Sequence, residues 1–406
     1  MHLAGPVALE SDVSLMEELD DIHHPSGCIK ALEDQAAKVY HADRCFLGVN
    51  GTTGVIHGML LGALNPGDKI LIPRNSHRSV MGGLVLGDLT PVYVRPCYSE
   101  TWRLSLQITP EQVEQAFQEQ PDLKAVFLTT PNYFGLAADT AKIAQIAHAH
   151  GAVLLVDEAH GPHLGFSEQP PSAMDCGADA AAQSTHKIVG AMTQCSLLQV
   201  RYGRLRPERL EAAMSLVTTT SPNYILMGSL DGAVAQLLDH GREMAEQSRR
   251  AGKLLRQVLR KLPGLPVLDQ ELLGQGGVAA VDGGKVTIQV SALGITGPEA
   301  AQALREQGIA VELVDQDHVL FLVTYADDTP EFAAVAEKIR QVLEKMAKAA
   351  GAMLPVPEPA ALPELVLPPR QAFFSRRHAV PFAEAAGEIA GESISFYPPG
   401  IPLVVP

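Results

Sequence analysis

The feature that most constrains this chain is a regular alternation of short apolar segments with longer amphipathic ones. The apolar segments that we predict to be strands are residues 47–50, 69–73, 91–94, 125–128, 152–156 and 178–183. The segments with the apolar spacing of helices are residues 54–64, 76–86, 111–119 and 139–150. Strands that are apolar throughout and alternate with helices form a parallel sheet covered on both faces. We therefore predict an α/β fold around a mostly parallel sheet.

The rest of the chain divides into further units. With about 150 residues per domain, a chain of 406 residues makes two or three domains. A long helical stretch lies at residues 223–262. The region after it contains strand-like segments at residues 285–291, 310–314 and 319–324 and helix-like segments at residues 298–307 and 330–346, which is typical of a small α+β domain. The predicted units are an N-terminal segment (1–30), a large domain with its connecting helix (31–262), a small α+β domain (263–350) and a Pro-rich C-terminal extension (351–406).

The extension is unusual because it holds 11 of the 29 prolines of the chain. Such a composition is common in disordered linkers. It also contains several large apolar side chains, namely Phe373, Phe374, Phe382, Ile394, Phe396 and Tyr397. We therefore expect the extension to pack on the body of the protein as an irregular segment.

Charge and cysteine content exclude several classes of protein. The chain has 31 basic and 46 acidic residues, a net charge of −15, so nucleic acid and anionic membranes are poor partners and a cationic small molecule is a compatible one. Its five cysteines form no C-x-x-C pair, residues 1–21 lack Lys and Arg, and no apolar run reaches the length of a membrane span. We expect a soluble, cytoplasmic protein with reduced thiols.

Polar residues follow each predicted strand directly. In parallel α/β sheets, ligands bind beyond the carboxyl ends of the strands, so these residues are candidates for a site. They are residues 51–53, 75–77, 129–130, 157–160 and 184–187.

Lys187 and Asp157 are the most reactive candidates in this set. A desolvated lysine at a strand end has a lowered pKa and suits Schiff-base chemistry, although a lone lysine in a loop is more often a surface residue. Asp157 ends an apolar strand, where a carboxylate needs a cationic partner such as a protonated pyridine nitrogen. Its alternative role is the N-cap of a following helix.

Two further segments complete a possible cofactor site. Gly51, Thr52 and Thr53 lie between a strand and a helix, where free backbone N–H groups and hydroxyls can bind a phosphate. No G-x-G-x-x-G or P-loop pattern accompanies them, so a nucleotide is not indicated. His77 follows the next strand and could stack on a cofactor ring or cap a helix.

Other histidines and cysteines carry weaker signals. The pairs His23–His24 and His160–His163 lack further ligands at a familiar spacing, so we predict no metal site. Cys195 is most simply a buried strand residue.

With these residues assembled, the chain resembles the Orn/Lys/Arg decarboxylases, pyridoxal 5'-phosphate (PLP) enzymes with the fold of aspartate aminotransferase. The resemblance covers residues 19–406. It rests on residues 19–27, 49–54, 73–79, 129–135, 156–161, 183–187, 218–224 and 395–402.

The resemblance implies a role for each candidate. Lys187 would form the imine with PLP, Asp157 would pair with the pyridine nitrogen, and His77 would stack on the ring beside His160. The phosphate would be held by Gly51, Thr52, Thr53, Ser184 and His186. Family members are homodimers, and the partner subunit would contribute the residues that correspond to Thr219, Thr220 and Ser221.

The resemblance implies decarboxylation of arginine or lysine, before ornithine, for polyamine biosynthesis. Lys187 or His186 would protonate the product carbon, and His77 and Asp157 complete the predicted catalytic set. The family's N-terminal His-x-Pro-Gly-His-Lys-like segment and its Gly-Glu after Pro406 have no match in this sequence. Two alternatives therefore stay open: another PLP reaction, such as transamination, and a non-catalytic homologue that regulates an active partner.

Overall fold

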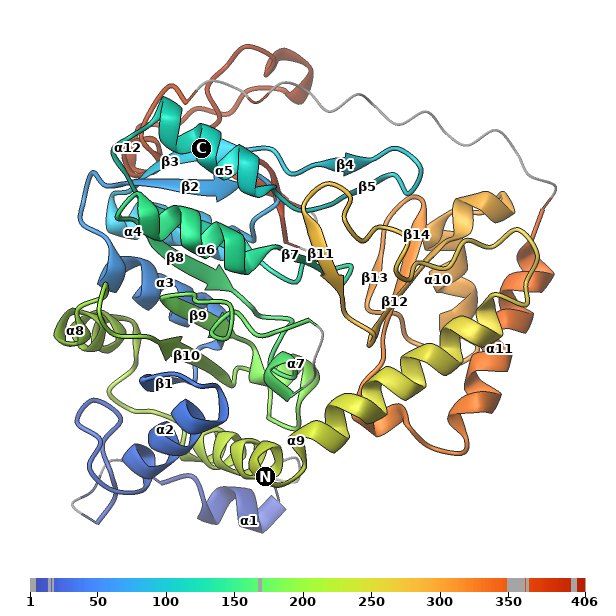
Figure 1. Ribbon diagram of the computed structural model, residues 1–406, viewed down its shortest axis with the longest axis horizontal. Helices are drawn as coiled ribbons and strands as arrows, with labels where there is room; N and C mark the ends of the chain where they lie inside the picture. Colours follow the sequence, from blue (N-terminus) through green and yellow to red (C-terminus); the bar gives the residue numbers. More distant parts are fainter. Residues whose placement is uncertain are drawn as a thin grey trace.

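The computed structural model describes residues 5–13, 16, 18–166, 170–348, 362, 365–395 and 400–405. Its centre is a seven-stranded sheet (Figure 1). The strand order is β1 (Arg44–Gly48), β10 (Ser196–Val200), β9 (Ala180–Gln183), β8 (Val153–Asp157), β6 (Leu123–Thr129), β2 (Lys69–Pro73) and β3 (Thr90–Val94). Strand β10 is antiparallel to both of its neighbours, and the other neighbouring pairs are parallel. The predicted α/β fold with a mostly parallel sheet is confirmed.

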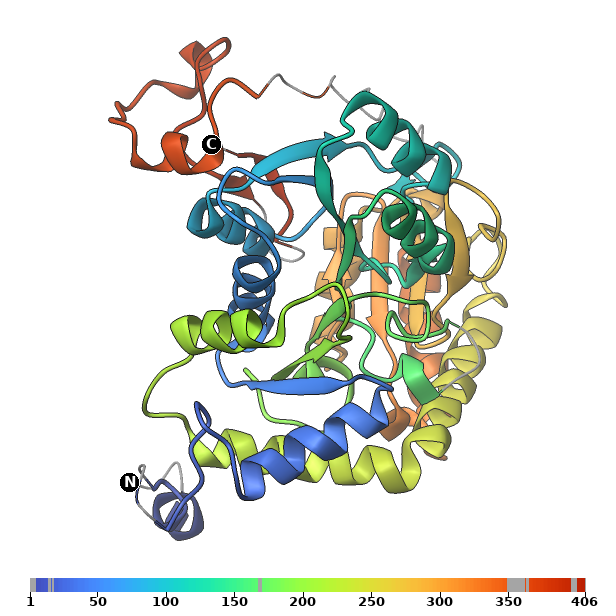
Figure 2. The same cartoon turned by 60° about the vertical axis from the view of Figure 1, so that its left-hand side comes forward.

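Helices cover both faces of this sheet. Apolar side chains of α3 (Gly51–Ala63), α4 (Arg78–Gly87) and α8 (Pro207–Val217) form one buried cluster with one face of the strands. Helices α5 (Pro110–Glu119) and α6 (Thr140–Ala149) form another cluster with the opposite face. Figure 2 shows the sheet between these two groups. Burial on both faces explains why the strands are apolar throughout rather than alternating.

A long helix joins the sheet to the rest of the chain. Helix α9 (Tyr224–Leu259) packs with α2 (Cys28–Val39) beside β1 and then continues away from the sheet (Figure 1). Its second half packs on a three-stranded sheet and two helices. These elements are β12 (Lys285–Gln289), β13 (Leu313–Val314), β14 (His318–Leu322), α10 (Gly297–Glu306) and α11 (Phe332–Met346).

One strand pair connects the two regions directly. Strand β11 (Val278–Val281), from the range predicted as the small domain, pairs with β7 (Leu136–Ala138) of the large-domain range. The chain between β11 and β12 thereby lies against the large domain. The boundaries of the four predicted units stay predictions.

The C-terminal extension contacts the body where it is described, but the apolar side chains expected to anchor it are exposed, at 48% for Phe373, 70% for Phe374, 88% for Phe382 and 39% for Ile394. Helix α12 (Pro369–Phe374) contacts α4, and Arg370 donates hydrogen bonds to the carbonyl oxygens of Val85 and Leu86. Farther along, β15 (Ile394–Ser395) pairs with β16 (Pro402–Val404), and Arg74 donates to the Pro402 carbonyl. Figure 2 shows this extension beside α4. The anchors Phe396 and Tyr397, residues 396–399 of the 395–402 match, and Pro406 lie outside the described residues.

Short elements complete the description. They are α1 (Gly5–Glu10), β4 (Tyr98–Ser99), β5 (Leu104–Ser105), α7 (Thr185–Ile188) and the 3₁₀ turns η1 (Leu164–Phe166), η2 (Val290–Leu293), η3 (Tyr325–Asp327) and η4 (Phe382–Glu384). Within the described ranges, no helix is both long and apolar enough to cross a membrane.

Two predicted helix starts differ from the structure. Helix α3 begins at Gly51 rather than at residue 54, so Gly51, Thr52 and Thr53 form its first turn. Helix α4 begins at Arg78 rather than at residue 76, because His77 has extended backbone and caps the helix with its side chain. Both differences place the predicted site residues at helix N-termini, where backbone N–H groups are free.

Candidate active site

A cavity of about 180 Å³ lies at the carboxyl ends of the central strands. It collects residues from all five of the strand-end groups identified in the sequence. The predicted site residues that line it are Gly51, Thr52, Thr53, His77, Asp157, His160, Ser184, His186 and Lys187. The strand-end rule therefore brought together side chains that are more than 130 residues apart in the chain.

The first turn of α3 forms one wall of this cavity. Gly51 has a φ of +66°, and no atom lies within 4 Å of the position that a Cβ would take there. The hydroxyls of Thr52 and Ser184 hydrogen-bond to each other across the cavity wall. Asn50 precedes the helix without capping it through its side chain. The Gly51 N–H donates to the Gln194 carbonyl oxygen at 2.9 Å, so the N–H groups of Thr52 and Thr53, together with the hydroxyls, are the groups that suit an anion such as a phosphate.

Asp157 is a buried carboxylate, with only 3% of its surface exposed. One carboxylate oxygen accepts a hydrogen bond from the N–H of Ala159 at 3.0 Å. Burial raises its pKa, while Lys187 and that hydrogen bond oppose the rise. The alternative role as a helix N-cap is wrong, because the next helical turn is η1, which starts at Leu164. A buried carboxylate that faces a cavity is suited to bind a cationic group.

His77 combines the two roles that the sequence left open. Its Nδ1 accepts a hydrogen bond from the Ser79 N–H at 3.2 Å, so the histidine is the N-cap of α4. The same ring lines the cavity. Burial and the nearby charges of Lys187 and Arg78 lower its pKa to about 4. The ring is therefore neutral at pH 7 and can lie against a flat aromatic ligand.

Lys187 lies in the short helix α7 rather than in a surface loop. Its Nζ is 3.2 Å from Nε2 of His160 and 5.6 Å from the centre of the Tyr133 ring. Burial lowers its pKa, and Asp157 and Glu312 partly oppose this. Next to it, His186 Nδ1 lies 2.7 Å from the Cys195 carbonyl oxygen and donates to it, which leaves Nε2 without the proton in the neutral ring. A lysine with a lowered pKa is a better nucleophile at neutral pH.

Sequence reasoning missed Lys285, which lies at the start of β12. This lysine is 1% exposed, and its Nζ lies 2.9 Å from Nδ1 of His160. A charged residue at the start of the predicted strand 285–291 was the available signal, but its partner is 125 residues away. Tyr133 was noticed only as part of a motif, and its ring lies 4.4 Å from that of His160.

Three predicted residues lie elsewhere. Thr219, Thr220 and Ser221 are exposed on the connection between α8 and α9, and they do not line the cavity of their own chain. The carbonyl oxygen of Thr219 lies 3.0 Å from Nε2 of His23. Their expected contribution to the site of a partner subunit stays a prediction.

The other histidines and cysteines have structural partners. His163 Nε2 lies 3.2 Å from a carboxylate oxygen of Asp282, away from the His160 contacts. No group of three or more potential metal ligands occurs among the residues that the structure describes. Cys195 is buried immediately before β10 rather than inside it, and burial raises its pKa to about 11.

The residues that line the cavity fit PLP. They supply an amine for its aldehyde (Lys187), a carboxylate for its pyridine nitrogen (Asp157), a flat neutral ring for its face (His77) and an anion-binding helix start for its phosphate (Thr52, Thr53). These four groups surround one cavity, as a single cofactor requires.

Comparison with known proteins agrees with this chemistry. Residues 1–273 match the family described as Orn/Lys/Arg decarboxylase, major domain. The chain belongs to that family. Arginine decarboxylases from Bacillus subtilis (strain 168) and Bacillus anthracis are 37% and 38% identical to it, over 99% of this chain and 83% and 82% of theirs.

Solved structures agree about the fold of this family member. Lysine decarboxylase A from Pseudomonas aeruginosa superposes with a TM-score of 0.82 and 21% identity, over 99% of this chain and 69% of that one. An aspartate aminotransferase from Thermus thermophilus superposes with a TM-score of 0.63 and 15% identity, over 84% and 96% of the two chains. The aspartate-aminotransferase-like fold predicted from the sequence is thereby confirmed.

Proposed function

We propose that the protein is a PLP-dependent decarboxylase whose substrate is arginine, with lysine as the alternative. Its family membership makes it a decarboxylase of a basic amino acid. The observation that carries the proposal is the convergence of Lys187, Asp157, His77 and the start of α3 on one cavity. The preference for arginine is supported by the identity to arginine decarboxylases along nearly the whole chain.

Each residue has a defined task in this proposal. When bound, PLP supplies an electron sink for the bond to the departing carboxylate. Lys187 would bind the aldehyde carbon, Asp157 would favour the protonated pyridine nitrogen, and His77 would lie against the ring. Thr52, Thr53, Gly51, Ser184 and His186 would hold the phosphate.

A proton must reach the carbon that loses carbon dioxide. Lys187 and His186 are the candidate donors, because both line the cavity. The lowered pKa of Lys187 supports its use as a donor near neutral pH. His186 uses Nδ1 on the Cys195 carbonyl, so its Nε2 is the nitrogen available for proton transfer.

We also propose that the protein works as a homodimer or a higher even oligomer in the cytoplasm. The exposure of Thr219, Thr220 and Ser221 supports a role across a subunit interface, and Leu216 nearby is 80% exposed. The five cysteines are all unpaired, which suits a reducing compartment.

The direct test measures carbon dioxide release from arginine, lysine and ornithine in parallel, with PLP added. We expect turnover of one basic amino acid and visible absorbance from the bound cofactor. Lys187→Ala should remove that absorbance and lower kcat/KM by about 10⁴-fold, because the amine both binds the cofactor and moves a proton. Lys142→Ala, at an exposed position on α6, is the control. Keto-acid formation without carbon dioxide would instead indicate transamination, and no turnover despite PLP binding would favour a regulatory homologue.

A further inference from the structure

Lys285 is a buried cation that the proposed decarboxylation does not use. It begins β12, far in the sequence from the strand-end motifs, yet its ammonium group reaches His160 at the cavity wall. Its Nζ lies 2.9 Å from Nδ1 of His160, and Nε2 of the same ring lies 3.2 Å from Nζ of Lys187. His160 therefore bridges two lysines.

The backbone around Lys285 explains why its position is fixed. The N–H of Asp282 donates to the Gly135 carbonyl, and Arg256 donates hydrogen bonds to the carbonyl oxygens of Gly283 and Lys285. A Cβ at Gly135 would lie 2.7 Å from Cβ of Lys285. The turn at residues 282–285 is thus held against the large domain from both sides.

The chemistry of the two lysines determines the state of His160. A neutral imidazole has one N–H donor and one lone pair, so between two lysines it can accept from one ammonium group and must donate to a neutral amine on the other side. With Lys285 as the ammonium group, Nδ1 presents its lone pair to Lys285 and the ring proton is on Nε2. That proton then points toward Nζ of Lys187, which accepts it as a neutral amine; burial lowers the pKa of Lys187 and so favours this form. A doubly protonated ring would place an N–H against an ammonium group, which is unfavourable.

We propose that Lys285 is a positioning residue that fixes His160 as the neutral Nε2–H tautomer and directs this N–H toward the reactive nitrogen at Lys187. The inference rests on the proposed function for its catalytic meaning, but the tautomer itself is a property of the protein without cofactor or substrate. Lys285 acts through His160 and does not line the cavity.

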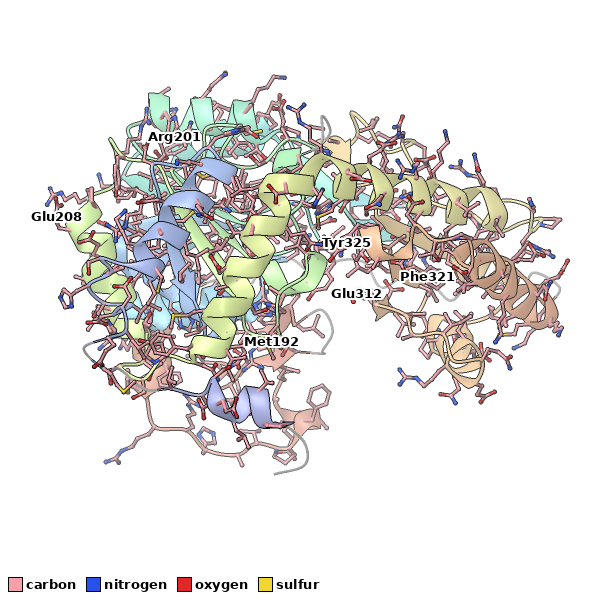
Figure 3. All side chains as sticks on the ribbon, turned by 90° about the horizontal axis from the view of Figure 1, so that it is seen from below. Met192, Arg201, Glu208, Glu312, Phe321 and Tyr325 are labelled. Atoms are coloured by element: carbon pink, nitrogen blue, oxygen red, sulfur yellow. The ribbon has the colours of Figure 1, made fainter. Side chains whose placement is uncertain are left out.

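Other charged and aromatic groups surround this pair. Burial and the charge of Lys187 lower the pKa of Lys285, whereas the charges of Asp282 and Glu312 stabilise its ammonium form. Figure 3 shows Glu312 at the side of the small domain that faces the large domain. His160 is close to Lys285, Lys187, His77 and His163, and it packs against the ring of Tyr133. Burial and the two lysines lower the pKa of His160 well below its usual value, in agreement with a neutral ring.

The control of the tautomer should depend on pH. Burial lowers the pKa of Lys285 to about 8. Below this pH the ammonium group can only donate to Nδ1, whereas above it the neutral amine can also accept a proton from Nδ1. We therefore expect the Nε2–H tautomer to dominate at pH 6–7 and the proton to become shared between the two ring nitrogens above about pH 8.

The first experiment is nitrogen NMR on protein with ¹⁵N-labelled histidine rings and without cofactor. The His160 signals are assigned by their loss in His160→Phe. In the wild type at pH 7, we expect Nδ1 to show the shift of an unprotonated nitrogen and Nε2 that of a protonated one. Lys285→Met, which keeps the length of the side chain without its charge, should move both signals toward the average of the two tautomers.

The matched control is Arg256→Lys. Lysine at position 256 keeps a cation that can donate to the carbonyl oxygens of Gly283 and Lys285, and the hydrogen bonds of Arg256 go to backbone carbonyl oxygens rather than to His160, so this variant alters the surroundings of the turn while the Lys285 ammonium group stays in place. We expect the His160 signals to stay at the wild-type positions. Equal shifts in both variants would overturn the proposal, and so would unchanged signals in Lys285→Met. If that variant does not fold, the absence of a step near pH 8 in the wild-type titration overturns it.

The second experiment tests whether the tautomer of His160 affects the rate of decarboxylation. Lys285→Met should lower kcat/KM about tenfold, the size typical of residues that orient a functional histidine. In the His160→Phe background, the same substitution should have no further effect, because its target is absent. A full additional loss in the double variant would show that Lys285 acts elsewhere. A protein without decarboxylase activity would contradict the proposed function, but the NMR result would still decide the role of Lys285.

Discussion

Two regions of the molecule contribute to the site in different ways. The strand ends of the large domain provide several adjacent residues each, such as Thr52 with Thr53 and His186 with Lys187. The turn at residues 282–285 contributes one side chain, Lys285, and only through His160. The strand ends are suited to hold a ligand by direct contact. The turn at residues 282–285 is suited to set the protonation of His160, which one of the strand ends provides.

This difference teaches where a site of this kind tolerates change. Direct contacts with a cofactor or substrate determine whether chemistry occurs, so their loss is expected to be severe. Groups that orient another side chain change only the fraction of molecules in which that side chain has its productive state. The loss of activity when such a group is removed is limited by that fraction. Three substitutions test this ranking, from the largest expected effect to the smallest.

Asp157→Asn tests the direct contacts of the large domain. The substitution keeps the shape of the side chain but removes its charge, so the pyridine nitrogen would lose the partner that keeps it protonated. We expect kcat/KM for arginine to fall by about 10²- to 10³-fold, while PLP still binds through Lys187. Measurements are steady-state carbon dioxide release and cofactor absorbance.

Asp139→Asn is the control for this substitution. Asp139 caps α6 by accepting from the Lys142 N–H, and Asn caps helices equally well. The activity of Asp139→Asn should stay at the wild-type level. A loss of less than threefold in Asp157→Asn would remove the distinction between direct and indirect contributions.

Gly135→Ala tests the contact between the two regions. Gly135 has a φ of +80°, and an added Cβ would lie 2.7 Å from Lys285 Cβ. We expect the turn to move away from His160, with a loss of about 2 kcal/mol in stability and about tenfold in kcat/KM. Denaturant unfolding and steady-state kinetics measure the two effects.

Gly151→Ala separates backbone strain from displacement of the turn. Its φ is +71°, but no atom lies within 4 Å of the position of its Cβ. The loss of stability in Gly151→Ala should therefore be similar to that in Gly135→Ala or smaller, and its activity should not fall. Equal kinetic effects at both glycines would mean that the position of Lys285 is unimportant.

Glu158→Gln tests a residue of the same strand end that points away from the cavity. Glu158 accepts hydrogen bonds from the Ala173 N–H and the Gln183 side chain, and burial raises its pKa from 4.5 to about 8. The folded protein thus keeps a proton that the unfolded chain releases. The contribution of this proton to the free energy of unfolding is fully present below pH 4.5 and is lost as the pH rises through 8.

The glutamine variant cannot titrate, so its stability should depend less on pH. We expect its Tm relative to the wild type to rise by at least about 3 °C between pH 5 and pH 8. Differential scanning calorimetry at several pH values measures this. A constant difference in Tm would show that Glu158 is ionised in the folded protein throughout the range.

Much of the fold and of the candidate site could be predicted from the sequence. The strands of the large domain are apolar because both faces of the sheet are buried, so each appears as a short uninterrupted run. Asp157, Lys187 and Thr52 were identifiable because each follows such a run, and the carboxyl ends of parallel strands meet at one edge. The short strand β13, by contrast, was predicted too long, since it consists of Leu313–Val314 only.

The remaining part depends on contacts that no local pattern encodes. His77 is both a helix cap and a cavity residue. The sequence could not separate these two roles, because both place His77 at the start of α4. The contact between Lys285 and His160 joins residues 125 positions apart. Such a contact depends on how β11 pairs with β7, and this pairing has no signature in either strand.

The sequence by itself therefore determined the kind of sheet, the edge at which a ligand binds and the reactive groups at that edge. These follow from burial and strand direction, which local apolar patterns record. Only the tertiary structure decided which groups set the protonation of those residues. The pKa of a buried side chain depends on desolvation and on charges within a few ångströms, and these distances are fixed by packing between distant segments.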